Sequence, residues 1–409
     1  MILHRTQENK IHEDLSKKMV FLVGPRQVGK TWLAKKIGEY YKNTIYLNYD
    51  SVSDRELIKN QSWLPNTELV ILDELHKMKN WKNYLKGLYD TKRPELKILV
   101  TGSARMETFR KTGDSLAGRF FTHHLLPLSL AELREEEIPD KMNLLIERSG
   151  FPEPFLAATN DEANRWRKFY TDSLIREDII TLDTVSDWRA LYDVFEILRR
   201  SVGAPISYAN IANDVGISPV TVKKYISALE MLYIIFSIRT YTKKIKRSIL
   251  KETKVYFYDT GLVIGEPGII FENFVAISLL KHITLRNDLL GTNEQLMYLR
   301  TKEGKETDFA FIDSENSLLS IMEVKLSDNK ISKNLIYFKD NELQQAVEKL
   351  NFAGRIKEYQ GDYLHINDTN YAGAKANLFV RHYITSQTTI GADGLVEREL
   401  VLEYKNPYP

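Results

Sequence analysis

The sequence predicts an α/β protein that opens with a mostly parallel, buried sheet. Short apolar runs alternate with helical stretches between residues 18 and 125, and a glycine-rich loop joins the first run to the first helix. Strands buried on both faces appear as continuous apolar runs, and their carboxyl ends carry the ligand-binding loops. The runs and the first helix read, in order, MVFLVG, TWLAKKIGEYY, TIYLNYD, LVILDEL and KILVTGS.

The composition is that of an ordinary folded protein. Hydrophobic residues make up 43% and charged residues 27% of the 409 residues, enough chain for about two to four domains. Cysteine is absent, which excludes disulfide frameworks, thiol catalysis and cysteine-ligated metals. We find no apolar run near the ~20 residues of a membrane span and no signal-peptide core, so we expect a cytoplasmic protein with no membrane partner. The net charge of +2 does not by itself indicate a nucleic-acid partner.

We expect five segments along the chain. Residues 1–142 hold the sheet and the glycine-rich loop, and residues 143–200 form a helical lid or connector. Residues 201–262 contain two short helices and a β-rich basic stretch, whereas residues 263–368 combine a helix with three strand-like runs. Residues 369–409 carry no pattern that assigns them to a fold.

The loop GPRQVGKT matches the phosphate-binding pattern G-x-x-x-x-G-K-[ST] and lies between a strand and a helix, the context that separates it from a chance glycine turn. Gly24 and Gly29 let backbone N–H groups surround phosphate oxygens, Lys30 reaches the terminal phosphates, and the Thr31 hydroxyl binds Mg²⁺. We therefore expect ATP and magnesium as cofactors. The expected nucleotide contacts in this segment are Gly24, Pro25, Arg26, Gln27, Val28, Gly29, Lys30, Thr31 and Trp32.

Two acids end the buried run LVILDEL. We expect Asp73 to hold the magnesium ion and Glu74 to polarise the attacking water. The alternative is that both acids only cap the helix that follows, since acids favour the first turn of a helix. The next run, KILVTGS, places Thr101 and Ser103 at a neighbouring carboxyl end, where they could contact the γ-phosphate or orient water.

Two arginines follow in SARMETFRKTGDSLAGRF, and an arginine beside the γ-phosphate neutralises charge in the transition state. We favour Arg119 over Arg105 for this role; the alternative is a solvated surface arginine. If Arg119 acts on the nucleotide of a neighbouring chain, the protein must form a homo-oligomer.

Four segments together resemble a large family of bacterial and archaeal AAA-type ATPases that carry a C-terminal domain of unknown function: GPRQVGKT, LDELHKMKNWKNYLKGLYD, TGSARMETFRKTGDSLAGRF and LPLSLAEL. The match runs from about residue 18 to residue 328. The resemblance implies that Glu74 promotes hydrolysis, that Ser103 stands where other AAA proteins have a polar sensor, and that Arg119 is an arginine finger. The usual sensor asparagine is missing.

The stretch SYANIANDVGISPVTVKKYISALEMLYII has helix-turn-helix spacing. Gly216 suits the turn, Ser218 caps the second helix, and Val222 and Tyr225 pack inward. The following β-rich stretch with its basic turn completes a predicted winged helix. Winged helices bind DNA or dock proteins, and the basic groups favour DNA phosphates. The predicted DNA contacts are Thr221, Lys223, Lys224, Lys243, Lys244, Lys246 and Arg247.

In EVKLSD, Glu323 and Lys325 lie two residues apart on a strand and therefore point to one face. A hairpin would place Asp308 beside them, with Glu272 on the preceding helix. Carboxylates of this kind hold Mg²⁺, and Lys325 could activate water for phosphodiester cleavage. The arrangement resembles the restriction-endonuclease-like PD-(D/E)XK fold, although Thr307 stands where that pattern has proline. We expect Asp308 and Glu323 to bind the metal; the alternative is an inert remnant.

Other aromatic and histidine residues carry no predicted chemistry. Trp166, Tyr170 and Tyr192 follow helical periodicity and are expected in a core, and His76 lacks metal-ligand spacing. We interpret the chain as a multidomain ATPase that engages DNA, with possible Mg²⁺-dependent nuclease activity. The rival is a nucleotide-switched oligomeric interaction or signalling protein whose C-terminal modules dock proteins and whose nuclease fold is inactive. Stimulation of ATP hydrolysis by DNA distinguishes the two.

Overall fold

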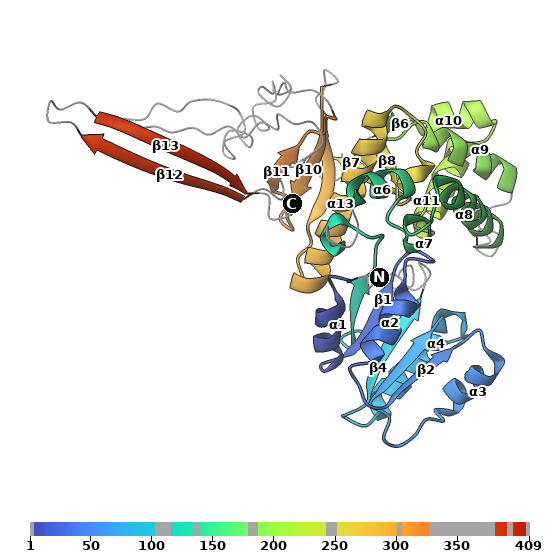
Figure 1. Ribbon diagram of the computed structural model, residues 1–409. Helices are drawn as coiled ribbons and strands as arrows, with labels where there is room; N and C mark the ends of the chain where they lie inside the picture. Colours follow the sequence, from blue (N-terminus) through green and yellow to red (C-terminus); the bar gives the residue numbers. More distant parts are fainter. Residues whose placement is uncertain are drawn as a thin grey trace.

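Three sheets and the helices around the first two form the described part of the structure, a computed structural model of the full chain (Figure 1). The residues it describes are 4–102, 116–133, 140–178, 187–242, 252–300, 305–326, 381–390 and 396–405. The predicted positions Ser103, Arg105, Lys243, Lys244, Lys246 and Arg247 lie outside these residues.

The first sheet has five strands in the order β2-β3-β4-β1-β5, and all of them run parallel. Every residue of β1 and β3 is buried, as expected for a sheet covered on both faces. The predicted parallel α/β unit is therefore confirmed. Its strands are β1 (Met19–Val23), β2 (Thr44–Asn48), β3 (Leu69–Asp73), β4 (Lys97–Gly102) and β5 (Phe120–His124), and its helices are α1 (Glu8–Leu15), α2 (Lys30–Gly38), α3 (Val52–Asn60) and α4 (Trp81–Thr91).

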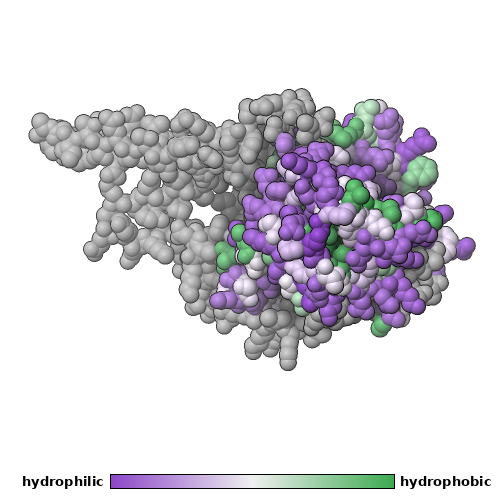
Figure 2. Space-filling model, turned by 90° about the horizontal axis from the view of Figure 1, so that it is seen from below, coloured by the Kyte–Doolittle hydropathy of each residue, from purple (hydrophilic) through white to green (hydrophobic). Residues whose placement is uncertain are grey.

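The surface at this end of the molecule is largely hydrophilic, with small hydrophobic spots between the polar residues (Figure 2). Exposed apolar side chains such as Val52 and Leu64 are scattered singly in the sequence. Isolated apolar residues of this kind are normal on soluble surfaces and indicate no docking site.

A helical region follows the first sheet, as the sequence predicts. Its helices are α6 (Lys141–Arg148), α7 (Pro152–Phe155), α8 (Asn160–Ser173), α9 (Trp188–Arg199), α10 (Tyr208–Val215) and α11 (Pro219–Met231), with one π-helical turn at Leu174–Asp178. Side chains that match the sequence rules cap several of them: Thr159 accepts a hydrogen bond from the N–H of Glu162, and Asp187 accepts from the N–H groups of Arg189 and Ala190.

The second sheet has six strands in the order β11-β10-β9-β7-β8-β6. Its strands are β6 (Pro205–Ile206), β7 (Ile235–Thr240), β8 (Thr253–Phe257), β9 (Gln295–Arg300), β10 (Glu306–Ile312) and β11 (Leu318–Met322). β7 pairs in parallel with β9, so one continuous sheet crosses the expected boundary at residues 262 and 263. The division into two modules stays a prediction, but the sheet that they share was not expected, because strand pairing between distant segments leaves no local signal in the sequence.

Helix α13 (Pro267–Leu290) is long and apolar enough to cross a membrane by length and composition alone. The expectation that no such stretch exists is therefore corrected. The helix packs against β5, β8 and β9, and it buries Phe271, Phe274 and Ile277. This packing is typical of a core helix, and Lys281 is buried within it.

The segment that the sequence left unassigned contains two strands. β12 (Arg381–Ile390) and β13 (Val396–Lys405) pair antiparallel, from Arg381 opposite Lys405 to Ile390 opposite Val396. They form a sheet of their own (Figure 1).

Candidate functional site

The glycine-rich loop connects the end of β1 to the start of α2. Gly24 and Gly29 have φ angles of 146° and 99°, backbone conformations that residues with a side chain rarely adopt. A Cβ atom on Gly24 would lie 2.2 Å from the carbonyl oxygen of Leu125. Glycine is thus required at Gly24 both by backbone conformation and by close packing, independently of any ligand.

Lys30 is buried at the first position of α2 and folds back over its own loop. Its ammonium group donates a hydrogen bond to the carbonyl oxygen of Gly24 at 3.0 Å and another to the carbonyl oxygen of Pro25. Burial lowers the pKa of Lys30 to about 8, against the opposing charges of Glu74 and Asp73. The lysine is therefore an ammonium group held by neutral carbonyl groups, which a phosphate can replace.

Asp73, the last residue of β3, collects three hydroxyl groups. Its carboxylate accepts hydrogen bonds from Thr31 Oγ1 at 2.8 Å and Tyr46 Oη at 2.6 Å, and a third from Thr101 Oγ1. The structure thus brings together Thr31, Asp73 and Thr101, as predicted. Carboxylate and hydroxyl oxygens are ligands that Mg²⁺ accepts, so the residues fit the implied ion. Tyr46 was missed, since its side chain reaches Asp73 from β2, a neighbouring strand.

Glu74 follows Asp73 in a left-handed backbone conformation with φ of 55°. Its carboxylate lies 3.6 Å from His76 Nε2 and 3.7 Å from Lys77 Nζ. Burial raises the pKa of Glu74, although Lys77 and Lys30 oppose the shift. Glu74 makes no side-chain capping hydrogen bond to the following 3-10 turn (Leu75–Lys77), so the capping alternative is wrong for this residue. We had assigned no role to His76, whose pairing with Glu74 is visible only in the fold.

Helix α8 contacts the loop from the next segment of the chain. Trp166 Nε1 donates a hydrogen bond to Gln27 Oε1 at 2.7 Å, and the Tyr170 hydroxyl donates to the carbonyl oxygen of Arg26 at 3.1 Å. The two rings stack with centroids 4.6 Å apart. Tyr170 is buried, in agreement with its expected core position, but both side chains also reach the loop with their polar atoms.

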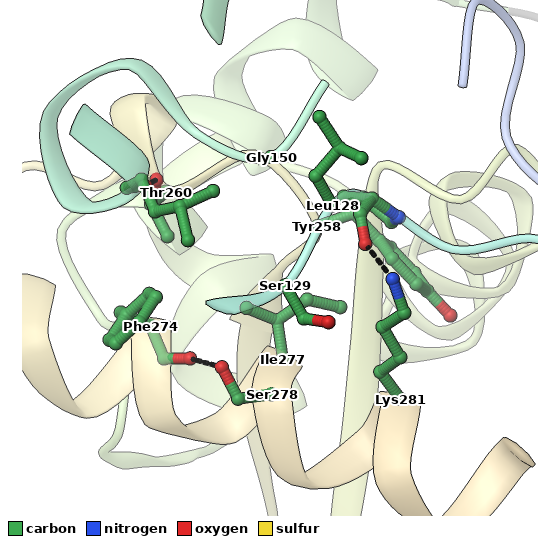
Figure 3. Close-up of a pocket in the computed structure, with 11 residues that line it drawn as sticks. Leu128, Ser129, Gly150, Tyr258, Thr260, Phe274, Ile277, Ser278 and Lys281 are labelled. Carbon is green, nitrogen blue, oxygen red and sulfur yellow. Dashed lines mark hydrogen bonds between the residues drawn. The ribbon is translucent and has the colours of Figure 1, made fainter. Parts of the chain in front are cut away.

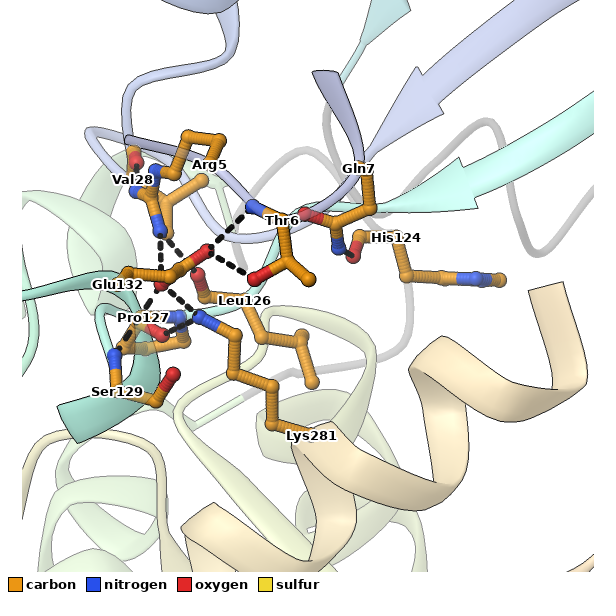
Figure 4. A network of polar contacts seen from close by, with 10 residues as sticks. All are labelled: Arg5, Thr6, Gln7, Val28, His124, Leu126, Pro127, Ser129, Glu132 and Lys281. Atoms are coloured by element: carbon orange, nitrogen blue, oxygen red, sulfur yellow. Dashed lines mark hydrogen bonds and ion pairs between the residues drawn. The ribbon is translucent and has the colours of Figure 1, made fainter. Parts of the chain in front are cut away.

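A buried charge network lies behind the loop (Figure 4). Arg5 donates hydrogen bonds to the carbonyl oxygens of Val28 and Leu126 and forms an ion pair with Glu132 at 3.2 Å. Glu132 also pairs with Lys281 of α13, which donates to the carbonyl oxygen of Pro127 at 2.7 Å. Burial lowers the pKa of Lys281 to about 8, although Glu132 opposes the shift. The network ties α13 to the backbone of the phosphate-binding loop.

A small cavity lies beside Lys281 (Figure 3). Its lining includes Leu128, Gly150, Thr260 and Phe274. Its volume is about 10 Å³. A cavity of this size holds about one water molecule and no larger ligand. The region is therefore a packed junction.

Arg119 directly precedes β5 and lies at the amino ends of the strands, whereas the phosphate-binding loop lies at their carboxyl ends. Its carbonyl oxygen accepts a hydrogen bond from the N–H of Met19, the first residue of β1, whereas the loop follows the last residue of β1. Its guanidinium pairs with Asp90 of α4, with N–O distances of 2.8 and 3.0 Å. The expectation that this arginine stands beside the γ-phosphate is thus corrected for the chain's own nucleotide, and action on a neighbour's nucleotide stays a prediction.

Trp32 is 43% exposed on α2, and the Lys36 ammonium lies 5.2 Å from its ring centroid. Its contact with nucleotide stays a prediction.

Three family profiles cover most of the chain. Residues 16–134 match an AAA domain, and residues 139–265 and 267–371 match two different domains of unknown function. The N-terminal region of the chain therefore matches an AAA-type P-loop ATPase domain. The glycine-rich loop lies within this region and is called the P-loop below, and the first sheet lies in the same region. The profile for the second domain joins the expected connector and the expected winged helix in one unit.

Similar proteins occur in bacteria and archaea. Uncharacterised proteins of Mycobacterium tuberculosis and Methanocaldococcus jannaschii are both 24% identical to this chain, over 246 and 355 residues. These alignments cover 60% and 78% of this chain and 55% and 77% of the relatives, so the chain spans about half the length of the mycobacterial protein.

Solved structures resemble this one weakly. The ORC1 protein of Aeropyrum pernix, determined in complex with DNA, has a TM-score of 0.34 at 15% identity, covering 69% of this chain and 95% of that one. A Walker-type ATPase of Pyrococcus abyssi has a TM-score of 0.42 at 15% identity, covering 66% and 96%. Both likenesses concern the fold alone.

In the second domain, α10 and α11 have the predicted helix-turn-helix arrangement. Gly216 ends α10 with φ of 75°, and Ser218 Oγ accepts from the N–H of Thr221 at 3.1 Å. Val222 and Tyr225 are buried, whereas Lys223 and Lys224 are exposed on α11, as predicted, and Thr221 is half-buried. The assignment as a winged helix stays a prediction.

In the third domain, Asp308 lies against the backbone of the segment that carries Glu323 and Lys325. Asp308 on β10 accepts a hydrogen bond from the N–H of Val324 at 2.8 Å, which holds its carboxylate at the backbone between Glu323 and Lys325. Lys325 Nζ lies 3.6 Å from Glu323 Oε1. Within the described residues, no three His, Cys, Asp or Glu side chains are arranged to hold a metal ion. A metal shared by Asp308 and Glu323 stays a prediction.

An unpredicted lysine stands among the carboxylates. Lys254 on β8 is buried, and its ammonium nitrogen lies 3.4 Å from Glu306, 3.7 Å from Asp308 and 3.9 Å from Glu272. Burial and the charge of Asp308 raise the pKa of Glu272 to about 7, opposed by Lys254 and by the Tyr256 hydroxyl that donates to Glu272 at 2.7 Å. We name this group, Lys254 with Glu272, Glu306 and Asp308, the carboxylate cluster.

Proposed function

We propose that the protein binds ATP with Mg²⁺ and hydrolyses it at the P-loop. The observation that carries this proposal is the set of hydrogen bonds that holds Thr31 and Thr101 on Asp73, directly beside Glu74. It supplies an oxygen site for a metal and an adjacent carboxylate for water at the end of one strand. The AAA profile over residues 16–134 supports the assignment.

Each P-loop residue has a step in this reaction. The backbone N–H groups of the loop bind phosphate oxygens, and Lys30 exchanges the carbonyls of Gly24 and Pro25 for the terminal phosphates. Thr31 and Asp73 would hold Mg²⁺, which neutralises charge on the phosphates. Glu74 orients the attacking water and draws its proton, a role that suits a carboxyl group whose pKa is raised above its usual value by burial.

We further propose that the nucleotide state controls how the second and third domains engage DNA. The P-loop touches the second domain through Trp166 and Tyr170, and it touches the third domain through Arg5, Glu132 and Lys281. Lys223 and Lys224 offer exposed positive charge on α11, where DNA phosphates could bind. These contacts, of which those of Arg5, Glu132 and Lys281 are buried, support a mechanical connection between nucleotide binding and DNA binding.

The experiment compares ATP turnover with and without single-stranded, duplex and branched DNA. We expect stimulation that Lys223→Ala with Lys224→Ala weakens across all DNA sequences, because phosphate contacts carry little base information. Lys59→Ala, which removes an exposed lysine from α3, is the matched control. Turnover that DNA leaves unchanged would favour the rival proposal, a nucleotide-switched interaction protein that docks other proteins.

Assembly is a separate proposal. If Arg119 acts on the nucleotide of a neighbouring copy, specific activity rises with protein concentration, and Arg119→Ala lowers turnover without lowering ATP affinity. Sedimentation measures the assembly. Concentration-independent activity in a monomer would contradict a role for Arg119 between copies.

A second candidate function is Mg²⁺-dependent cleavage of nucleic acid by Asp308, Glu323 and Lys325. The hydrogen bond from Val324 to Asp308 favours it, because it holds the aspartate beside the strand end that carries the other two. Asp308→Ala and Lys325→Ala should then abolish divalent-dependent cleavage and leave ATP turnover largely intact.

A further inference from the structure

Lys254 is the most deeply buried member of the carboxylate cluster. Its side chain is 3% exposed, whereas those of Glu272, Glu306 and Asp308 are 19%, 25% and 20% exposed. Burying an ammonium group is costly unless opposite charges surround it. Here the three carboxylates come from two elements, α13 and β10, and they converge on a lysine from a third, β8.

Each carboxylate also has a second protein partner. Glu272 accepts from the Tyr256 hydroxyl at 2.7 Å, and Asp308 accepts from the N–H of Val324 at 2.8 Å. Glu306 Oε1 lies 3.2 Å from Arg300 Nε. The donors and the cations that the carboxylates need are therefore supplied by the chain itself.

The Lys254 ammonium lies between the three carboxylates, whose side chains in this structure are spaced for an ion pair and are not arranged as a metal site. A divalent cation binds carboxylate oxygens at about 2.0 to 2.6 Å, whereas the ammonium nitrogen of Lys254 lies 3.4 to 3.9 Å from its three carboxylates, the range of ion pairs. An ammonium group and a divalent ion cannot share this space, because both would need the same oxygens and would repel each other.

We propose that the Lys254 ammonium is the resident cation of the carboxylate cluster and that it excludes divalent metal ions from it. The cluster then joins β8 of the second domain to α13 and β10 of the third. Gly203 of the second domain packs so closely on Glu272 that a Cβ atom there would lie 2.8 Å from Glu272 Oε1. The inference is independent of ATP hydrolysis at the P-loop, and it opposes the nuclease candidate at this cluster.

Replacing the lysine tests the proposal by a gain of metal binding. In Lys254→Met, three carboxylates face a space without a cation, so we expect one new Mn²⁺ site, at least tenfold tighter than any site in the parent protein. Lys254→Arg keeps the positive charge and should gain none. The full chain is measured without nucleotide by electron paramagnetic resonance of Mn²⁺. All proteins carry Asp73→Asn, which removes the P-loop carboxylate from the titration.

Two further measurements keep the outcome decisive. Mn²⁺ should raise the melting temperature of folded Lys254→Met, but not that of Lys254→Arg, and adding Asp308→Asn should remove the effect. Folded Lys254→Met that binds no Mn²⁺ would overturn the proposal. If Lys254→Met does not fold, the parent protein decides: absence of Mn²⁺ binding supports the proposal, and a Mn²⁺ site that Asp308→Asn removes overturns it.

Discussion

Lys30 and Lys254 are both buried lysines beside candidate sites, but they face different partners. Lys30 donates to two backbone carbonyl groups of its own loop, whereas Lys254 lies among three carboxylates. Carbonyl dipoles stabilise an ammonium group less than full negative charges do. Lys30 can therefore exchange its carbonyl partners for an incoming phosphate, whereas the positive charge of Lys254 is already balanced by carboxylates.

The first prediction tests the role of Lys30 at the P-loop against that of Lys254, and it has the largest expected effect. Lys30→Ala should abolish measurable ATP binding, because it removes the charge that meets the terminal phosphates. Glu74→Gln should keep the ATP affinity and lower turnover by about 10² to 10⁴, since only water activation is lost. Lys254→Met should leave the ATP affinity within about twofold. Calorimetry and a phosphate-release assay measure both quantities, and equal loss of affinity in Lys30→Ala and Glu74→Gln would contradict the role of Glu74.

The second prediction uses Lys281, a third buried lysine, which pairs with one carboxylate, Glu132. Lys281→Met should lower the free energy of unfolding by about 3 to 5 kcal/mol, because it leaves Glu132 buried with Arg5 as its remaining charged partner. Urea denaturation measures the change. Lys281→Arg, which keeps the charge, should lose less, and the exposed Lys59→Met should lose almost nothing. A loss below about 1 kcal/mol would show that the network does not stabilise the junction.

The third prediction concerns the pH dependence of stability at the carboxylate cluster. The folded-state pKa of Glu272 is raised from 4.5 to about 7, so its contribution is fully present below pH 4.5 and is lost as the pH rises through 7. We expect Glu272→Gln to flatten the stability curve in this window by up to ~3 kcal/mol. Exposed Glu266→Gln is the control. Parallel curves for Glu272→Gln and the parent protein would contradict the raised pKa.

The sequence predicts the P-loop well because its parts are local. Gly24 to Thr31 are consecutive, and Asp73 and Glu74 end a recognisable strand. Tyr46 and Lys254 were missed, since each reaches its site from a neighbouring strand or domain. Tyr46 stands in an apolar run, and Lys254 stands at the end of a basic stretch, so neither has a distinctive local pattern. Glu132 contacts Arg5 and Lys281 across 127 and 149 positions of sequence, a separation at which one sequence carries no pairing signal.

The position of Arg119 and the pairing of β7 with β9 mark the same limit of prediction from one sequence. The order of strands along the chain does not say which end of β5 faces the P-loop until its pairing with β1 is known. Nor does it say that β7 pairs with β9 across two domains. Local composition fixed the elements, whereas the edges of the sheets, which decide both points, depend on contacts between distant segments.

The last prediction concerns the pH dependence of ATP affinity, which follows from the titration of Lys30. In the nucleotide-free protein its pKa is lowered to about 8, and bound phosphates must raise it, so binding takes up a proton above pH 8. The dissociation constant for ATP should therefore rise by up to about tenfold per pH unit above 8 and change little between pH 6.5 and 7.5. Calorimetry in buffers of different ionisation enthalpy measures the proton uptake directly. Glu74→Gln should show the same slope, because its lysine is intact. An ATP affinity that stays constant from pH 7 to 9.5 would mean that Lys30 keeps its proton without a ligand, and that its two carbonyl partners stabilise the ammonium group as well as the carboxylates stabilise Lys254.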